Sequence, residues 1–280
     1  MSELVTITVA DHVADVRLNR PEKMNALSMA MFEAISAAAQ QIMRDRSVRA
    51  VVLSGEGRAF CAGLDLANFT DPQAFGGNPF GPERGGFWPN FYQQPGYLWK
   101  DVPVPVIAAL HGAVFGGGLQ IALGADIRIA HPEMKMSLME IKWGLIPDMS
   151  GTQTLRDLVR IDIAKELAFT GRVVGGAEAE KIGLVTRLDE HPHTAAMALA
   201  REIVTKNPQA IMLDKLILES TWHGDDARGL ELEEKLQASV IMSTNQVEAV
   251  MAGMQKRPAI FSERTIDRLD RANPLNNIAR

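Results

Sequence analysis

The stretch HGAVFGGGLQIAL, residues 111–123, joins three consecutive glycines to an apolar run that can form a helix. Glycine has no Cβ, so a ligand can come close to the backbone at Gly116–Gly118. A helix N-terminus also leaves unpaired N–H groups and the positive end of a dipole. Together these features can hold a developing oxyanion. Taken alone, however, a glycine-rich turn before an apolar helix more often serves close packing.

Two carboxylates follow this stretch, in the segment EIKWGLIPDMSG at residues 140–151. Either Glu140 or Asp148 could transfer a proton in a reaction. Each also has a structural alternative. Glu140 could be a salt-bridged surface residue, and Asp148 could be the N-cap of a helix that begins near Met149.

A second glycine-containing motif, GRAFCAGLDL at residues 57–66, comes directly after the apolar run AVVLS at residues 50–54. The length and flanks of that run predict a buried strand. A loop at the carboxyl end of such a strand is where α/β proteins bind ligands. The alternative is a plain turn that holds Gly63 at positive φ.

Together with NRPEKMNAL at residues 19–27 and PDMSGTQ at residues 147–153, these motifs resemble those of the crotonase (enoyl-CoA hydratase/isomerase) superfamily. The resemblance extends from about residue 19 to about residue 188. It implies an α/β fold with a crotonase-type ββα spiral core over residues 1–200, for acyl-CoA binding and catalysis. It also implies a C-terminal helical oligomerisation region over residues 201–280.

The resemblance further implies a lyase or isomerase of fatty acid metabolism that acts on an acyl-CoA thioester. Coenzyme A would be part of the substrate, so no separate cofactor is expected. The assembly would be a homotrimer or a hexamer. Lys256 and Phe261 would lie where they touch the CoA of a neighbouring subunit.

Site residues follow from the same motif match. In the family, the two oxyanion-hole donors are backbone N–H groups at positions that match Leu64 and Gly117. The substrate-binding backbone would comprise Ala62, Gly63, Leu64, Asp65 and Gly117. Glu140 would be the general base and acid, with Asp148 as its partner. His111 has a structural role in its turn, because carboxylates do the acid–base work in this family.

Gln120 departs from the pattern of the hydratases, which use glutamates at positions that match Gln120 and Glu140. An amide cannot exchange a proton as a carboxylate does. We therefore expect double-bond isomerisation to outrank hydration, with Gln120 binding the substrate or orienting a water.

Other reactions of the superfamily stay open. The 4-chlorobenzoyl-CoA dehalogenases use an aspartate that matches Asp148 as a nucleophile, but they carry a tryptophan where this chain has Glu140. Carnitinyl-CoA dehydratase-like members also have Pro-Asp at this place. The alternatives are thus a dehydratase, hydrolysis or dehalogenation with Asp148 as nucleophile, and a non-catalytic acyl-CoA binder.

Composition and charge narrow the possible partners, metals and locations of the protein. The net charge of −5 and the absence of a Lys/Arg run argue against a nucleic-acid partner. The single Cys61 excludes an internal disulfide, and no His/Cys spacing suggests a metal. No basic segment followed by an apolar one marks a signal peptide, so we expect a cytoplasmic protein. Residues 102–125 lack formal charge, but their prolines and glycines favour a buried strand and helix over a membrane span.

The local pattern predicts strands at residues 4–9, 13–18, 104–110 and 126–130, and a helix from the N-cap Ser28 to about Arg46. A short helix, a glycine stop and a strand are expected over residues 177–185. After Thr194 the pattern is helical to the end. The aromatic-rich segment at residues 68–99 has no clear periodicity, and it is either a partly ordered lid over the acyl group or a surface insertion.

Overall fold

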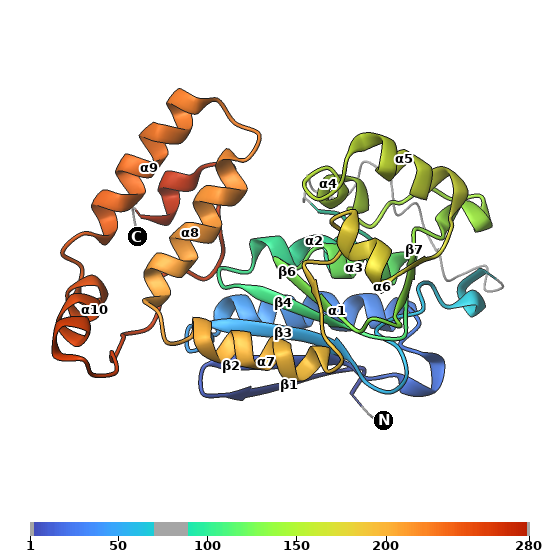
Figure 1. The fold of residues 1–280 in the computed structure, drawn as a ribbon, viewed down its shortest axis with the longest axis horizontal. Helices are drawn as coiled ribbons and strands as arrows, with labels where there is room; N and C mark the ends of the chain where they lie inside the picture. The colour runs from blue at the N-terminus through green and yellow to red at the C-terminus, as the bar shows by residue number, and fades with distance from the viewer. Residues whose placement is uncertain (1–2, 70–88, 279–280) are drawn as a thin grey trace.

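The computed structural model, which describes residues 3–69 and 89–278, is built around a six-stranded sheet (Figure 1). The strands lie in the order β1-β2-β3-β4-β6-β9. Their bounds are β1 Val5–Ala10, β2 Val13–Leu18, β3 Ala50–Gly55, β4 Val106–Leu110, β6 Ile127–Ala130 and β9 Arg187–Leu188. Only the β1–β2 pair is antiparallel in this sheet, so the carboxyl ends of β2, β3, β4 and β6 meet at one edge.

A smaller second sheet continues from that edge. It contains β5 (Ala113–Phe115), β7 (Lys135–Ser137) and β8 (Val174–Gly175), in that order. The chain passes from β4 to β5 and from β6 to β7, so successive turns add one strand to each sheet. This arrangement is the ββα spiral that the sequence predicted, and residues 102–125 form β4, β5 and a helix. Within the described residues, no helix is both long and apolar enough to cross a membrane.

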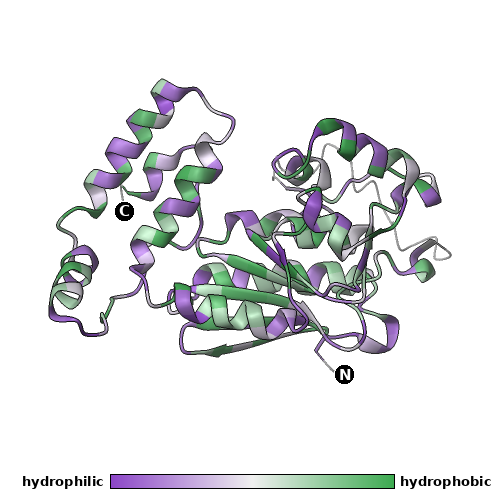
Figure 2. Cartoon of the chain, viewed as in Figure 1, coloured by the Kyte–Doolittle hydropathy of each residue, from purple (hydrophilic) through white to green (hydrophobic). Residues whose placement is uncertain are grey.

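Alternate residues of β3 pack into two separate cores, as the period of two in a strand requires. Val51 and Leu53 belong to the cluster that includes helix α1, whereas Ala50 and Val52 pack with helix α7. Helix α1 spans Met29–Arg44, and helix α7 spans Pro192–Ile203. Figure 2 shows the hydrophobic colour along the strands of this central sheet. The sheet is therefore covered on both faces, which explains its wholly apolar runs.

The remaining helices surround the spiral and extend beyond it. Around the spiral lie α2 Gln94–Asp101, α3 Gly117–Leu123, α4 Gly151–Leu155, α5 Ile161–Thr170 and α6 Gly176–Lys181. The C-terminal helices are α8 Pro208–Thr221, α9 Asp226–Val240 and α10 Thr244–Gln255. Short 3₁₀ turns are η1 Pro21–Lys23, η2 Leu66–Phe69, η3 Glu140–Trp143 and η4 Pro274–Asn277. In Figure 1, α8 to α10 form a lobe beside the spiral, with a hydrophobic cluster of its own.

Most of the expected elements are confirmed, including the Ser28 cap, whose hydroxyl oxygen accepts from the Met31 N–H. Two expectations are wrong. The chain is not helical to its end, because residues 256–273 form neither helix nor strand. The strand expected near residue 185 lies at β9 instead. The aromatic-rich segment contains α2, whose Leu98 and Trp99 are buried against the core, as is Tyr92 just before it.

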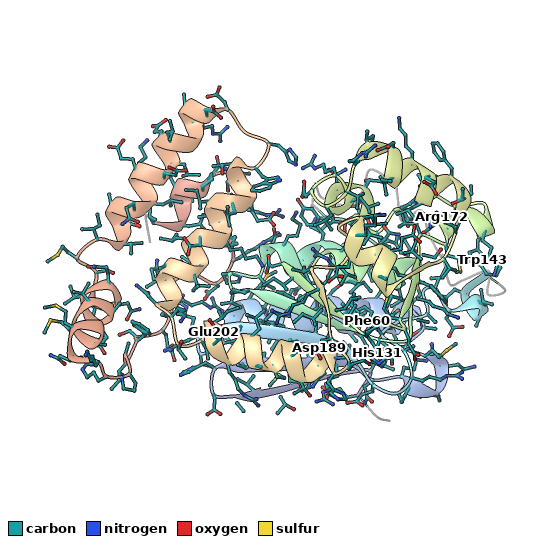
Figure 3. The ribbon with its side chains drawn as sticks, in the orientation of Figure 1. Phe60, His131, Trp143, Arg172, Asp189 and Glu202 are labelled. Atoms are coloured by element: carbon teal, nitrogen blue, oxygen red, sulfur yellow. The ribbon has the colours of Figure 1, made fainter. Side chains whose placement is uncertain are left out.

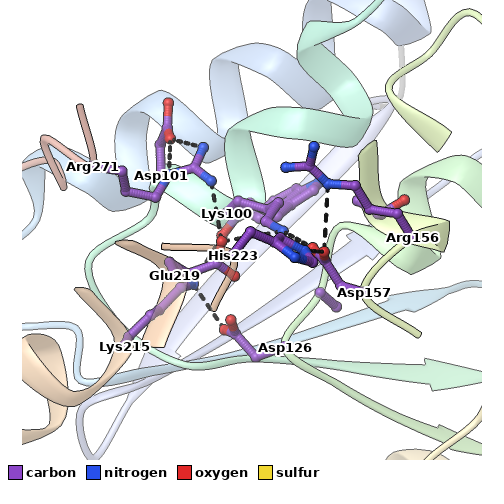
Figure 4. Close-up of polar contacts among 12 residues, drawn as sticks. Lys100, Asp101, Asp126, Arg156, Asp157, Lys215, Glu219, His223 and Arg271 are labelled. Atoms are coloured by element: carbon purple, nitrogen blue, oxygen red, sulfur yellow. Dashed lines mark hydrogen bonds and ion pairs between the residues drawn. The ribbon is translucent and has the colours of Figure 1, made fainter. Parts of the chain in front are cut away.

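A network of charged side chains joins the C-terminal lobe to the spiral (Figure 4). The Lys100 ammonium on α2 lies 3.0 Å from Asp157 and 3.1 Å from Glu219 on α8. Arg271 binds the same Glu219 carboxylate at 3.1 Å and Asp101 at 2.6 Å. One glutamate of α8 is thus held by two cations from different parts of the chain.

Lys215 is the least exposed cation of this network. Its ammonium lies 2.8 Å from the Asp126 carboxylate and donates to the carbonyls of Trp99 and Val104 at 3.0 and 3.2 Å. Only 7% of its surface is exposed. Since all three of its protons are used, the charge is fully compensated inside the protein.

We expect Lys215→Met to lower the free energy of unfolding by roughly 3–5 kcal/mol, because it leaves the partly buried Asp126 and two buried carbonyls without their cation. Lys235→Met, which removes an exposed pair with Glu231, is the control and is expected to cost less than about 1 kcal/mol. Urea unfolding monitored by circular dichroism measures both. Equal losses in the two variants would contradict the role assigned to Lys215.

Candidate active site

A buried asparagine shapes the loop of residues 57–66. The Asn25 amide donates to the carbonyls of Glu56, Ala59 and Phe60 at 3.0, 2.9 and 3.1 Å. Its side-chain oxygen accepts from the Arg20 N–H at 2.8 Å. Sequence reasoning used the motif NRPEKMNAL but did not single out Asn25. The signal for it was a polar residue of turn type inside that motif.

Among the described residues, backbone pairing on either side of Leu64 leaves the N–H of that residue free. The N–H of Ala62 donates to Met24 O at 2.9 Å, and the N–H of Asp65 donates to Leu27 O at 3.1 Å. Between them, the Gly63 carbonyl accepts from the Leu27 N–H at 2.8 Å. In the described part of the chain, the N–H of Leu64 has no protein acceptor.

The second free N–H lies on the neighbouring strand-to-helix turn. A Cβ on Gly63 would lie only 2.8 Å from the Phe115 carbonyl oxygen, so this loop and the end of β5 are in backbone contact. Gly117 begins α3 two residues later, and its N–H also has no acceptor among residues 3–69 and 89–278. The structure therefore brings the two N–H groups expected from the sequence onto adjacent backbone segments.

Glu140 lies beside these donors. A Cβ on Gly116 would be 3.5 Å from Glu140 Oε1, and the side chain is buried. Oε1 accepts from Gln120 Nε2 at 2.6 Å, whereas the buried Oε2 has no partner in the described residues. Burial raises the pKa of Glu140, and the charge of Asp148 raises it further, against the hydrogen bond from Gln120. Such a carboxyl group is suited to accept and return a proton.

Asp148 lies on the exposed loop that precedes α4. Desolvation by the surrounding protein raises the pKa of its carboxyl group. The alternative role as a helix N-cap is wrong, because α4 begins at Gly151 and Ser150 precedes it without a side-chain capping bond. The charge of Asp148 also acts on Glu140, whose pKa it raises.

Gln120 takes the place of the missing cap. Its side-chain oxygen accepts from the N–H groups of Met149 and Gly151, both at 2.9 Å. The residue has no exposed surface, so the protein itself holds the whole amide. The sequence suggested contact with the substrate or a water, but the structure places its bonds between Glu140 and the start of α4.

Three other residues have structural partners. A ring nitrogen of His111 lies 2.9 Å from the Gly57 carbonyl, which confirms its role in the turn. The Asp65 carboxylate binds Arg20 at 2.6 Å, which lowers its pKa. Burial raises the pKa of the Cys61 thiol to about 12, so this cysteine is not a nucleophile.

Two expectations extend beyond the described site. Residues 70–88, most of the expected lid, lie outside the described residues. At the end of that segment Phe91 and Tyr92 pack against Phe32, with ring centroids 5.8 and 5.6 Å away. Lys256 and Phe261 lie on the C-terminal lobe, and their contact with a neighbouring subunit stays a prediction.

Figure 3 labels two residues from the segments that carry the site. Phe60 lies in the interior, in the loop that carries Leu64. Trp143 lies at the surface, at the end of the turn η3 that begins with Glu140. In the described residues, no group of three or more His, Cys, Asp or Glu side chains is placed to hold a metal ion. The spiral with its glycine turns at the strand ends defines an α/β protein of the crotonase class.

Comparison with known proteins gives the family. The family model described as enoyl-CoA hydratase/isomerase matches residues 8–264. The chain is 33% identical over 248 residues to the mitochondrial methylglutaconyl-CoA hydratase of Mus musculus, which covers 86% of this chain and 76% of the relative. It is 34% identical over 259 residues to the mitochondrial enoyl-CoA hydratase domain-containing protein 2 of the same species, covering 89% and 84%. The chain belongs to the enoyl-CoA hydratase/isomerase family.

Solved structures agree with this assignment. The enoyl-CoA hydratase of Mycobacterium tuberculosis has a TM-score of 0.81 at 28% identity, over 93% of this chain and 99% of that one. The enoyl-CoA hydratase of Bacillus anthracis has a TM-score of 0.79 at 31% identity, over 92% and 98%. The protein is thus an enzyme of the crotonase type.

We expect Gly63→Ala to lower the turnover of an enoyl-CoA thioester by about 10²–10³-fold, the usual cost of losing one oxyanion donor. The new methyl group would press on the Phe115 carbonyl, and the φ of +90° also disfavours alanine. Gly175→Ala is the control, because a Cβ there has no neighbour within 4 Å. Steady-state kinetics on folded variants measure the effect. Unchanged turnover in Gly63→Ala would contradict the assignment of Leu64 as a donor.

Proposed function

We propose that the protein is an enoyl-CoA isomerase in which Glu140 alone moves the proton. The observation that carries this proposal is the state of Gln120, whose amide is bonded at both ends inside the protein. Since this amide is committed, it neither exchanges a proton nor holds a reacting water. The unpartnered Oε2 of Glu140 is then the proton acceptor beside the two free N–H groups.

The proposed reaction begins with a 3-enoyl-CoA thioester whose carbonyl oxygen accepts from the N–H groups of Leu64 and Gly117. Glu140 Oε2 takes a proton from C2, and the electron pair moves into a dienolate. The two N–H donors stabilise the negative oxygen as it develops. Glu140 then returns the proton to C4, and the double bond moves to C2–C3. The proton that leaves C2 is returned at C4, so the atoms balance without a separate cofactor. Coenzyme A stays on the substrate throughout.

Hydration is the second candidate, and Asp148 is the observation that favours it. Its carboxyl group is accessible and its charge acts on Glu140. Two carboxylates could divide the work of activating a water and protonating the enolate. The relatives named above as hydratases make this the natural competitor.

Mass spectrometry in deuterated water tests the proposal with 2-enoyl-CoA and 3-enoyl-CoA as substrates. We expect deuterium-labelled isomer without a water adduct in the wild type. Loss of the general base in Glu140→Gln should reduce this exchange by about 10²–10⁴-fold. Asp148→Asn should reduce it far less. A water adduct as the main product would overturn the proposal and favour hydration, and binding without turnover would favour an acyl-CoA binder.

The pKa of Glu140 also predicts a stability effect. Because burial raises this pKa, the native state holds the proton more tightly than the unfolded chain. The associated stability is full below the unfolded pKa and is lost as the pH rises through the native pKa. At neutral pH, Glu140→Gln should therefore raise the free energy of unfolding by about 1.4 kcal/mol for each pH unit by which the native pKa of Glu140 exceeds its unfolded pKa.

Urea unfolding at about pH 7 and about pH 4 measures this gain, which should disappear at the lower pH. Glu233→Gln on the exposed face of α9 is the control and should change stability by less than about 0.5 kcal/mol. A Glu140→Gln variant that is less stable than the wild type at neutral pH would contradict the buried-charge assignment.

We further propose that the protein is a homotrimer or a hexamer that associates through its C-terminal helices. The support is a set of exposed apolar side chains on α10: Val247, Val250, Met251 and Met254. Met254 is the most exposed of the four, at 77%, and their spacing along the helix places them on one face. These side chains can be covered by a second copy of the chain.

Met254→Glu should shift the protein to smaller species in size-exclusion chromatography with light scattering, because it places a charge in an apolar interface. Glu234→Gln on α9 is the control and should leave the mass unchanged. A wild type that elutes as a monomer would contradict the proposal.

A further inference from the structure

Gln120 connects the two acidic segments of the site. Its Nε2 donates to Glu140 Oε1 at 2.6 Å, and its Oε1 accepts two N–H groups, one on each side of Ser150. One of these N–H groups belongs to Met149, the residue directly after Asp148. A single side chain thus fixes the Glu140 carboxylate relative to the loop of the second carboxylate.

The chemistry of these contacts leaves one orientation for the amide. The end that faces Met149 and Gly151 must accept, because both neighbours donate. The end that faces Glu140 must donate, because an ionised carboxylate only accepts. A glutamate at residue 120 would satisfy the first end, but it would place two carboxylate oxygens 2.6 Å apart at the second. Those oxygens would have to share a proton.

Packing also restricts the side chain to this position. Gln120 is completely buried on α3. A Cβ on Gly151 would lie 2.7 Å from Gln120 Oε1, so the glycine is what lets the amide reach the start of α4. The hydrogen bonds and the steric fit therefore select the same rotamer.

We propose that Gln120 is a positioning residue that binds Glu140 through Oε1, leaves Oε2 alone to face the substrate, and favours the ionised form of Glu140. The inference rests on the proposed function, in which Oε2 is the proton acceptor. Gln120 would not touch the substrate, and it would act only through Glu140.

The surrounding charges support this role, because none of them replaces the amide. Within residues 3–69 and 89–278, Glu140 forms no ion pair. Lys142 on the same turn is exposed and lies over the Trp143 ring. Arg172 after α5 binds Glu166 and Glu178 instead. Asp148, from the loop before α4, repels the ionised form of Glu140. The hydrogen bond from Gln120 is thus the side-chain interaction that, together with a hydrogen bond from the backbone of Glu140 itself, lowers the pKa of Glu140 against burial.

The test is the titration of Glu140 followed by NMR on protein labelled with ¹³C at glutamate carboxyl groups. Comparison with Glu140→Gln identifies the signal. Gln120→Met removes the donor, so the midpoint should rise by on the order of one pH unit. Gln120→Glu should give two coupled steps, the upper one raised by more than about one unit. The pH dependence of kcat/KM should shift in the same direction in both variants.

Gln153→Met is the matched control, because its amide is exposed on α4 and bonds only to Thr152 in the described residues. It should leave the titration unchanged. Gln120→Glu keeps the bonds to Met149 and Gly151, so the test stands even where Gln120→Met does not fold.

Unshifted titration in a folded Gln120 variant would overturn the inference. A shifted titration in an enzyme that shows no isomerisation would instead reject the proposed function and leave the positioning role in place. The two failures are therefore distinguishable.

Discussion

The close approach of two backbone segments is the constraint on which the site depends. The loop that carries Leu64 and the turn that begins α3 lie so near that a single methyl group on Gly63 would strike the Phe115 carbonyl. Because no side chain separates them, two N–H groups from distant parts of the chain can serve one ligand oxygen. Backbone donors held in this way need no reorganisation when charge develops. The parallel sheet supplies the rigid frame, since β3 and β4 end at the same edge.

A second layer of buried polar contacts holds this geometry in place. Asn25 gathers three carbonyls of the donor loop, and Gln120 joins Glu140 to the start of α4. Buried polar groups stabilise a structure only where their partners are complete. Asn25 meets this condition, whereas Glu140 leaves one buried oxygen unpaired. This cost falls on the atom that we propose as the proton acceptor, and unmet hydrogen bonds are expected to collect at functional sites.

The sequence predicted the strands and glycine turns better than the hydrogen bonds that join them. Apolar runs of strand length identified β3 and β4, and the glycine motifs identified the backbone around Leu64 and Gly117, because both depend on local pattern. The roles of Asn25 and Gln120 escaped prediction, since their bonds join residues 20 to 35 positions apart and leave no period in the sequence. The capping role that was the structural alternative for Asp148 is performed instead by the Gln120 amide from another helix, which no local pattern shows.

The difference between an amide and a carboxylate at residue 120 changes the number of bases, although the two side chains have nearly the same shape. A carboxylate so close to Glu140 would hold a proton between the pair, and the site would contain two groups able to exchange it. The amide instead forms hydrogen bonds with the protein at both ends. In the proposed reaction, Glu140 is then the group at this point that exchanges a proton. An isomerisation moves one proton along the substrate, so a single base on one face of the enolate can both remove the proton and return it. In the proposed isomerase, the choice of reaction therefore depends on a buried residue that acts through Glu140.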